Sequence, residues 1–348
     1  MRRRLNTLYV TTEGAWLHKD GGNVVLDVDG QTKGRVPAHK LESLICIGRV
    51  LVSPALLGYC AEQGICVCFL SRHGRFLARV EGPVSGNVLL RRRQYLCTDD
   101  AGACTAIVSH MLQGKLHGQR MVLARGLRDH GDRLADSARQ AITDAIKRLQ
   151  RLAERLWVTT SVDELRGLEG DAARLYFGVF DHLIRVSDPQ LRFQGRSRRP
   201  PKDAINALLS FLYTLITHDC RGALETVGLD RAVGFLHRDR PGRPSLALDL
   251  LEGFRPMLAD RLALSLINRR QLTAKDFHLL DNGGIILKDE ARKAVLTAYQ
   301  ERKQVEVLHP FLGEKLELGL LPYVQAQLLA RHLRGDVMTQ QFLLSSRG

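Results

Sequence analysis

Two acidic residues in the second half of the chain could share a divalent cation. Asp249 and Glu252 lie three positions apart in the run Leu248-Asp-Leu-Leu-Glu252, and residues with this spacing share one face of a helix. The two carboxylates would repel each other at this spacing. Because leucines surround them, burying their charges would also be costly. A divalent cation would neutralise both charges. An exposed acidic stripe on an amphipathic helix is the alternative.

Glu169 and His237 could complete such a site. Glu169 is followed by Gly170 and two nearby alanines, which leave space beside its carboxylate, although the helix dipole also favours an acid near a helix start. His237 ends the apolar run Gly234-Phe-Leu-His237 before an arginine- and proline-rich loop, where a neutral imidazole could face a cleft or merely cap the segment. Carboxylates with one imidazole favour Mg²⁺ or Mn²⁺. Such ions hold phosphodiester oxygens and stabilise the transition state of their displacement.

The charge balance indicates a polyanionic partner. The chain has 348 residues with 51 Lys+Arg against 37 Asp+Glu, a formal net charge of +14, which favours nucleic acid before a membrane surface. Residues 192–202, RFQGRSRRPPK, carry five positive charges and no acid, and residues 91–93 are three arginines. A solvated loop is the alternative. The side chains expected to contact DNA phosphates are Arg196, Arg198, Arg199, Lys202 and Arg255.

Other features exclude several classes of protein. No apolar run approaches the roughly 18–20 residues that span a bilayer, and the arginine-rich start lacks the apolar core of a signal peptide, so we expect a cytoplasmic protein. Seven cysteines are an odd number without zinc-site spacing, which predicts reduced core thiols. No phosphate-binding loop of the ATPase type is present.

The pattern of residues predicts an α+β protein with two domains. Residues 1–85 have the short β-branched runs of a β-rich domain, with a hairpin turn at 20–22 and one helix from Ser53-Pro54 to about Gly64. Residues 86–95 are predicted to be a linker. Residues 96–348 have the apolar spacing of an all-α catalytic domain. Its expected helices are near 133–149, 161–187, 202–226, 245–267, 273–281, 289–303 and 321–334.

Four motifs in order resemble a known family. They are GLEGDAARLYF at 167–177, RPPKDAINALLSFLY at 199–213, GFLH at 234–237 and LDLLEGFRP at 248–256. With Asp260 and Asn268 after them, they make essentially the whole chain similar to the CRISPR-associated adaptation integrase, the first of the two universal spacer-acquisition proteins. The chain is most similar to versions from type I systems, of subtype C.

The resemblance implies a metal-dependent DNA endonuclease and integrase that inserts short foreign DNA fragments into a CRISPR array. In this reaction the 3′-hydroxyl ends of the fragment attack phosphodiesters of the repeat. The implied ligands of Mg²⁺ or Mn²⁺ are Glu169, His237 and the acids Asp249 and Glu252, of which either could be the inner ligand. The implied partners are double-stranded DNA, a second copy of the chain, the small second adaptation protein and a RecB-like nuclease.

Two further residues of these motifs are predicted to support the site. Asn206 lies in an apolar helical run and should be hydrogen-bonded, either to orient a ligand near the metal or at a helix–helix contact. Tyr176 could pack in the core or stack near DNA.

Two other functions fit part of the sequence. A basic DNA-binding scaffold would use the same positive charge, with its acids serving only structure. An HD-type metal phosphohydrolase would use the dipeptide His218-Asp219 together with His182 and Asp230, although here the dipeptide falls towards the end of a predicted helix.

Overall fold

A computed structural model describes residues 6–72, 76–80, 88–309 and 311–337 of the chain. The contacts divide the chain into two compact units, residues 1–85 and 86–348. The first unit is β-rich and the second is helical, which confirms the predicted α+β fold class. The three arginines at 2–4 and the first two residues of the predicted linker lie outside the described residues.

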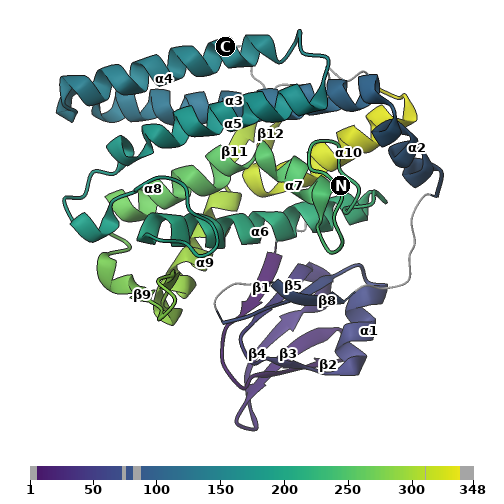
Figure 1. Cartoon of the computed structure of the whole chain (residues 1–348). Coiled ribbons are helices and arrows are strands. Elements are labelled where there is room, and N and C mark those ends of the chain that lie inside the picture. The colour runs from purple at the N-terminus through teal and green to yellow at the C-terminus, as the bar shows by residue number, and fades with distance from the viewer. Residues whose placement is uncertain (1–5, 73–75, 81–87, 310, 338–348) are drawn as a thin grey trace. The chain divides into compact units, whose positions relative to one another are not determined.

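The described residues of the N-terminal unit form two four-stranded sheets and one α-helix (Figure 1). One sheet has the order β1-β5-β7-β8 and the other has the order β4-β3-β2-β6. The hairpin between β2 and β3 turns at Gly21, whose φ of 57° favours glycine. The strands are β1 (Asn6–Val10), β2 (Trp16–Asp20), β3 (Asn23–Val28), β4 (Gln31–Pro37), β5 (Leu41–Ile47), β6 (Leu51–Val52), β7 (Cys66–Leu70) and β8 (Phe76–Val80).

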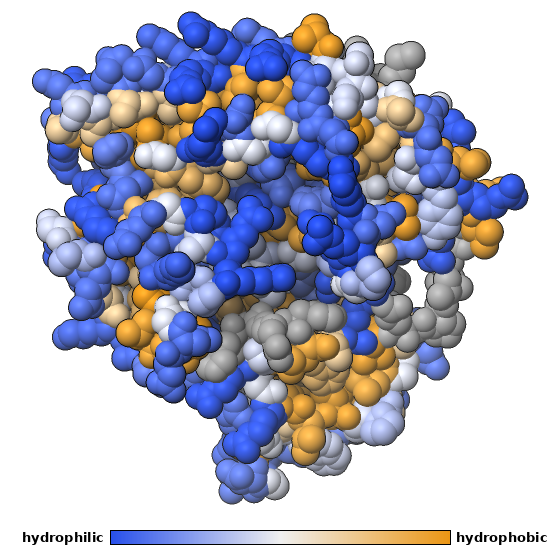
Figure 2. Space-filling model, in the orientation of Figure 1, coloured by the Kyte–Doolittle hydropathy of each residue, from blue (hydrophilic) through white to orange (hydrophobic). Residues whose placement is uncertain are grey.

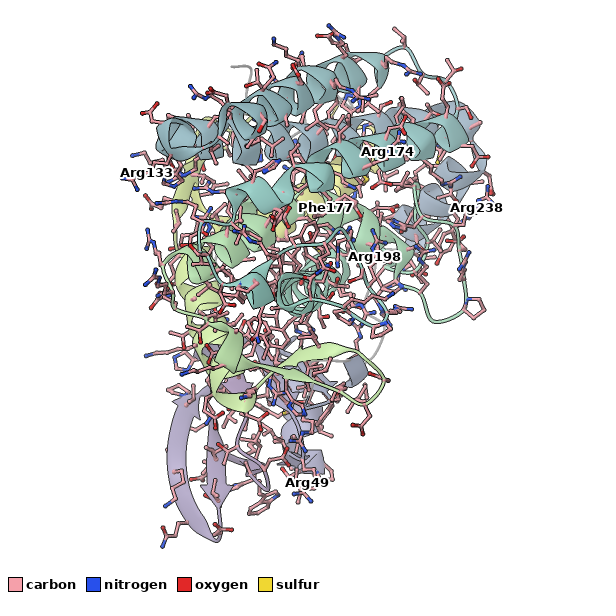
Figure 3. The ribbon with its side chains drawn as sticks, turned by 60° about the vertical axis from the view of Figure 1, so that its left-hand side comes forward. Arg49, Arg133, Arg174, Phe177, Arg198 and Arg238 are labelled. Atoms are coloured by element: carbon pink, nitrogen blue, oxygen red, sulfur yellow. The ribbon has the colours of Figure 1, made fainter. Side chains whose placement is uncertain are left out.

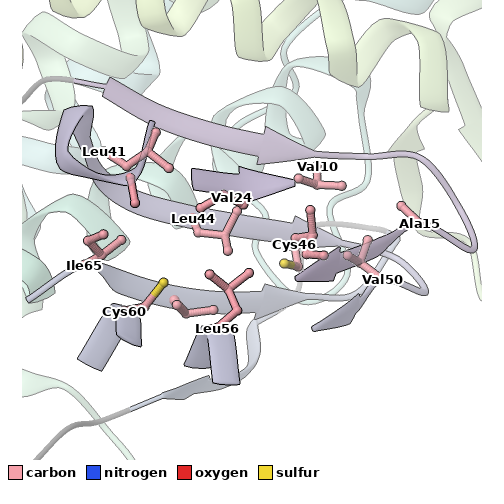
Figure 4. Packing of buried hydrophobic residues seen from close by; sticks show 13 residues of the cluster. Val10, Ala15, Val24, Leu41, Leu44, Cys46, Val50, Leu56, Cys60 and Ile65 are labelled. Carbon is pink, nitrogen blue, oxygen red and sulfur yellow. The ribbon is translucent and has the colours of Figure 1, made fainter. Parts of the chain in front are cut away.

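The core of this unit lies between the strands and α1 (Pro54–Glu62) (Figure 4). Ser53 caps α1 by accepting a hydrogen bond from the Leu56 N–H, and Pro54 occupies the first turn, as predicted. Cys46 and Cys60 face the core. Burial raises the pKa of the Cys46 thiol to about 12 and that of Cys60 to about 11, so both remain protonated.

The helical unit is built around α3 (Ala101–His130), whose 30 residues span about 45 Å. Figure 1 shows α4 (Asp136–Arg155) and α5 (Val162–Gly178) alongside α3, and both helices contact it. Gly118 permits close packing of α3, because a Cβ there would lie 3.1 Å from the Pro256 ring. Figure 2 shows hydrophilic residues over much of the face that it draws, with hydrophobic residues gathered in patches between them.

The acidic motif lies in a helix that changes its geometry. The helix α7 (Ser245–Glu252) is followed by a π-helical segment, Arg255–Asp260, and then by α8 (Arg261–Asn268). π-helical turns are rare in proteins, and those that do occur are frequently at functional sites. The long helix α6 (Ala204–Thr226) packs against α7 and against the π-helical segment.

The remaining elements complete the helical unit with two small hairpins. They are α2 (Val88–Asp99), β9 (Phe277–Leu279), β10 (Ile285–Leu287), α9 (Asp289–Lys303), β11 (Glu306–Leu308), β12 (Lys315–Glu317) and α10 (Leu321–Arg334). In the described part of the chain, no helix combines the length and the apolar character that are needed to cross a bilayer.

Several expectations about elements are wrong. The helix expected near 161–187 ends at Gly178 and is followed by a 3₁₀ turn at Phe180–Leu183. Residues 88–95 form the first two turns of α2 instead of a linker, because the buried Gln94 amide donates to the carbonyls of Asp230 and Val233 and so docks the helix. Residues 273–281 form a 3₁₀ turn and β9 instead of a helix, since Gly283, with φ of 74°, closes a hairpin that pairs β9 with β10. The helix at 245–267 is interrupted as described above.

The HD dipeptide is part of a buried ion pair between helices. Asp219 Oδ2 accepts a hydrogen bond from the Tyr299 hydroxyl at 2.7 Å and lies 3.0 Å from Lys303 Nζ. His218, Asp219 and Lys303 are all buried. His182 lines a different cavity, and Asp230 accepts a hydrogen bond from Tyr95, so the structure does not bring the HD set together.

Replacing Lys303 should therefore destabilise the helical unit. Lys303→Met leaves the Asp219 carboxylate buried without its cation, and we expect the free energy of unfolding to fall by about 3–5 kcal/mol in urea denaturation. Lys293→Met changes an exposed lysine of the same helix and should cost no more than about 0.5 kcal/mol. Equal effects of the two substitutions would contradict the role assigned to this pair.

Candidate active site

A lysine from α3 joins two carboxylates that come from distant parts of the sequence. Lys115 Nζ contacts Glu169 Oε1 of α5 and lies 2.7 Å from Glu252 Oε2 of α7. The side chain of Lys115 is only 4% exposed, while that of Glu169 is 26% exposed. The cluster is therefore a buried charge group with one carboxylate open to solvent.

Arg255 provides a second cation for Glu252. Its guanidinium lies 3.1 Å from Glu252 Oε1 and 4.8 Å from the centre of the Tyr213 ring. Burial alone would raise the pKa of Glu252, but the charges of Arg255 and Lys115 outweigh it and lower that pKa to about 2. A charge on the His237 ring would lower this pKa as well, so the imidazole lies within electrostatic range of Glu252. Glu252 is thus ionised at any physiological pH.

Asp249 holds His237 in place. Its Oδ1 lies 2.6 Å from His237 Nδ1 and accepts the His237 backbone N–H, while its Oδ2 accepts the N–H groups of Phe235 and Leu236. An ionised carboxylate can only accept, so Nδ1 carries a proton, and in the neutral imidazole the lone pair is then on Nε2. The four hydrogen bonds occupy Asp249, whose side chain is 0% exposed.

Gly234 lets the histidine segment approach this aspartate. A Cβ at Gly234 would lie 2.8 Å from Asp249 Oδ2 and 2.9 Å from the carbonyl carbon of Ser245. Real Cβ contacts are not this short, so any larger residue would push the segment away from α7. In contrast, a Cβ at Gly170 beside Glu169 would meet nothing within 4 Å, which agrees with the open space expected there.

A second buried acid lies behind the charge cluster. Asp260 accepts hydrogen bonds from the hydroxyls of Tyr176 at 3.0 Å and Tyr213 at 2.7 Å. Burial raises the pKa of Asp260 to about 6, although both hydroxyls oppose the shift. Tyr176 is fully buried, so it packs in the core, which is one of the two roles expected for it.

Asn206 organises the basic loop. Its Nδ2 donates to Gly195 O and to Asp203 Oδ2, and its Oδ1 accepts from Arg196 and from the Ser197 N–H. Asn206 is therefore hydrogen-bonded as expected, and it ties the loop to the start of α6. Arg196 lies 5.3 Å from the Tyr213 ring.

The five predicted DNA contacts fall into two groups. Arg198, Arg199 and Lys202 are exposed and could reach a phosphate directly. Arg196 and Arg255 are partly or largely buried against Tyr213 and make the contacts described above. In this structure their guanidinium groups are therefore engaged by other residues of the protein.

A cavity of about 350 Å³ opens beside His237. Its lining includes Cys104, Arg166, Phe235, His237 and Arg238. Arg166 donates to the Leu236 carbonyl at 2.6 Å, which fixes a guanidinium at the rim. Asp99 and Asp239 also line the cavity, and Asp163 pairs with both arginines, so charges of both signs lie next to the imidazole.

The donor chemistry of this site fits a divalent cation. Among the described residues, no three histidine, cysteine, aspartate or glutamate side chains are grouped as a preformed metal site. However, the Lys115 ammonium lies between Glu169 and Glu252, so this position already stabilises a positive charge. The buried Oε2 of Glu252 faces this ammonium at 2.7 Å, so a cation that replaced the ammonium would meet the same oxygen.

The family is decided by comparison with known proteins. A family model described as "CRISPR associated protein Cas1" matches residues 8–301. A CRISPR-associated endonuclease Cas1 of Rhodospirillum rubrum is 60% identical over 97% of this chain and 97% of its own length. Another of Chlorobaculum tepidum is 52% identical, again over 97% of each chain. The chain belongs to the Cas1 family.

Solved structures share the Cas1 fold. A Cas1 protein of Thermotoga maritima matches with a TM-score of 0.79 at 24% identity, over 99% of this chain and 100% of that one. A structure titled "Casposase bound to integration product" matches with a TM-score of 0.81 at 22% identity, over 97% and 93% of the two chains.

Some Cas1 relatives are part of larger proteins or assemblies. A Cas4 exonuclease/Cas1 endonuclease fusion of Rhodospirillum rubrum is 35% identical over 95% of this chain and 56% of its own length. A structure titled "Cas6-RT-Cas1--Cas2 complex" matches with a TM-score of 0.82 at 24% identity, over 100% of this chain and 37% of that one.

Sequence reasoning missed Lys115, which belongs to this Cas1 site as much as the acids do. It lies within the run Gln113-Gly-Lys-Leu-His117, between apolar stretches of a helix. A single lysine in such a pattern is normally exposed, and only the acids of α5 and α7 explain its burial.

Lys115→Met should destabilise this Cas1 protein. The substitution leaves Glu252 buried with Arg255 as its one remaining cation, and we expect the free energy of unfolding to fall by about 3–5 kcal/mol. The double variant Lys115→Met/Glu252→Gln should lose less than the sum of the single changes. Lys147→Met, at an exposed position of α4, is the matched control. A Lys115 variant as stable as this control would show that the cluster is unimportant.

Asp260 should give the stability a characteristic pH dependence. The folded protein protonates Asp260 with a pKa near 6, against 3.8 for an ordinary aspartate, so its contribution is greatest below pH 4 and is lost as the pH rises through 6. Wild type should therefore lose about 2 kcal/mol relative to Asp260→Asn between pH 4 and 7. Urea denaturation at each pH measures the difference. The exposed Asp281→Asn variant should follow wild type, and parallel curves for all three proteins would refute the assignment.

Proposed function

We propose that this Cas1 protein is a divalent-cation-dependent DNA endonuclease and integrase. It inserts short DNA fragments into a CRISPR array when the 3′-hydroxyl ends of the fragment attack phosphodiesters of the repeat. The observation that carries the proposal is the convergence of Glu169 and Glu252 on one buried cation with His237 nearby. High identity to curated Cas1 endonucleases supports the nuclease activity.

Glu169, Glu252 and His237 would hold Mg²⁺ or Mn²⁺. The ion, when bound, polarises a phosphodiester oxygen and stabilises the charge that develops in the transition state. Glu252 offers a permanently ionised oxygen, and His237 offers the free lone pair of Nε2. Asp249 acts through His237, because its oxygens are occupied by the ring and the backbone. We therefore assign Glu252 as the inner acid of the motif and Asp249 as the residue that positions the imidazole.

The positively charged side chains around this site would bind the DNA backbone. Arg198, Arg199 and Lys202 extend from the loop that Asn206 holds, and Arg238 lies at the rim of the cavity beside His237. Guanidinium groups bind phosphates through paired hydrogen bonds. These contacts would place a phosphodiester next to the acids without reading its sequence.

Cas2 and a nuclease of the Cas4 kind are the protein partners that we propose, together with a second copy of this chain. Support comes from the Cas1–Cas2 complex and the Cas4/Cas1 fusion among the proteins described above. A non-catalytic DNA scaffold would use the same surface, but it would not need the partly exposed carboxylate of Glu169 beside the buried pair of Lys115 and Glu252.

The test is the joining of a short DNA duplex to a plasmid that contains a CRISPR repeat, with Mn²⁺ and Cas2. Wild type should join the DNA, and Glu169→Gln and His237→Ala should each lose at least about 100-fold in rate. Both variants should still bind DNA, because the phosphate contacts are elsewhere. The control Glu164→Gln alters an exposed acid of the same helix and should join normally. Variants that join as fast as wild type, or a wild type that binds DNA but never joins it, would favour the scaffold.

A further inference from the structure

A second basic cavity lies towards the other end of α3, away from the acidic cluster. Its volume is about 430 Å³, and it is lined from α3, from the segment that follows α5, from α8 and from α9. Arg125, one of its lining residues, is ten positions beyond Lys115, which is about 15 Å along the helix. In Figure 3, Arg133 beside this region lies at the opposite end of the helical unit from Arg238, which lines the His237 cavity.

The lining of this cavity is strongly positive. Five arginines and two histidines line it, against a single carboxylate among the described residues, that of Asp129. Asp129 is already engaged, since Arg125 and Arg128 lie 3.0 and 3.2 Å from its oxygens. The five arginines are Arg125, Arg185, Arg261, Arg269 and Arg302.

Within the described chain, four of these arginines form no ion pair with a carboxylate: Arg185, Arg261, Arg269 and Arg302. Arg302 donates only to the Met257 carbonyl, at 3.1 and 3.3 Å. Burial lowers the pKa of Arg302 to about 10, and the charges of Arg261 and Arg125 lower it further in the same direction. The guanidiniums are thus close enough to repel, and an anion between them would remove the repulsion.

The shape and chemistry of the cavity indicate which anion. Guanidinium groups match the oxygens of phosphate better than lysines do, because each presents a planar pair of donors. One wall is apolar, with Leu134, Leu183 and Leu262, so the cavity offers a surface for a sugar or base next to its positive charge. Its volume also exceeds that of one phosphate ion.

We propose that this cavity is a second nucleic-acid site, which binds backbone phosphates of a DNA strand away from the acidic cluster. The proposal rests on the proposed function in one respect, namely that the ligand is DNA. Its role is to hold a distant part of the same DNA while the strand end lies at Glu169 and Glu252. It therefore contributes affinity and placement but no chemistry.

The test compares a double variant with a matched control across a salt titration. Arg261→Gln/Arg269→Gln removes two charges whose side chains make no hydrogen bond in the described structure, so folding should be preserved and is checked by the thermal midpoint. Affinity for a fluorescent duplex with single-stranded ends should fall several-fold at low salt. The slope of log K against log salt should become shallower by about 1–2, since each phosphate contact contributes about 0.9. Arg148→Gln/Arg151→Gln removes two exposed charges of α4 and should leave the slope within about 0.3 of wild type.

Inorganic phosphate distinguishes a DNA strand from a small anion. Phosphate at constant ionic strength should raise the thermal midpoint of wild type and not that of the Arg261/Arg269 variant, and the variant should also show the shallower DNA slope. Protection by phosphate with an unchanged DNA slope would overturn the assignment to DNA. The same slope in wild type, variant and control, without protection by phosphate, would overturn the site itself. Strand joining is measured separately, so failure of the integrase proposal would leave this result readable.

Discussion

The buried contact between Lys115, Glu169 and Glu252 constrains the rest of the helical unit. Charges removed from water are tolerated only when their partners are held in place, so α3, α5 and α7 must meet at this point. Gly118 allows α3 to pack closely on the segment after α7. Arg255 on that segment provides the second cation for Glu252. The site is thus a structural requirement of the fold as well as a place for chemistry.

The same arrangement leaves the three expected metal ligands with different degrees of freedom. Glu252 is locked by two cations, whereas Glu169 is partly exposed and His237 keeps Nε2 free. A divalent ion would compete with the Lys115 ammonium for the two carboxylates. The charges of Glu169 and Glu252 would be neutralised with either cation in place. Behind this group, Asp260 accepts a hydrogen bond from the Tyr213 hydroxyl and so fixes the Tyr213 ring. Arg255 and Arg196 stack on that ring.

Much of this could be predicted from the sequence, because motifs report local chemistry. The spacing of Asp249 and Glu252 indicated a shared helix face, and the four motifs identified the Cas1 family, although assignment to subtype C stays a prediction. The burial of Lys115 could not be predicted, since its partners lie 54 and more positions away. Arg255 was expected to meet DNA phosphates, but its nearest anion is Glu252 at i−3. Residues 273–281 have helical spacing, yet the glycine turn at 283 pairs them as a strand.

The central claim is that Glu169, Glu252 and His237 together hold a divalent cation. The most direct test is the anomalous scattering of Mn²⁺ in crystals of this protein soaked with that ion. The account predicts a peak bounded by one oxygen of each glutamate and by His237 Nε2, with the Lys115 ammonium displaced from between the carboxylates. A peak elsewhere in the molecule, or none at saturating Mn²⁺ with Lys115 still in place, would contradict it.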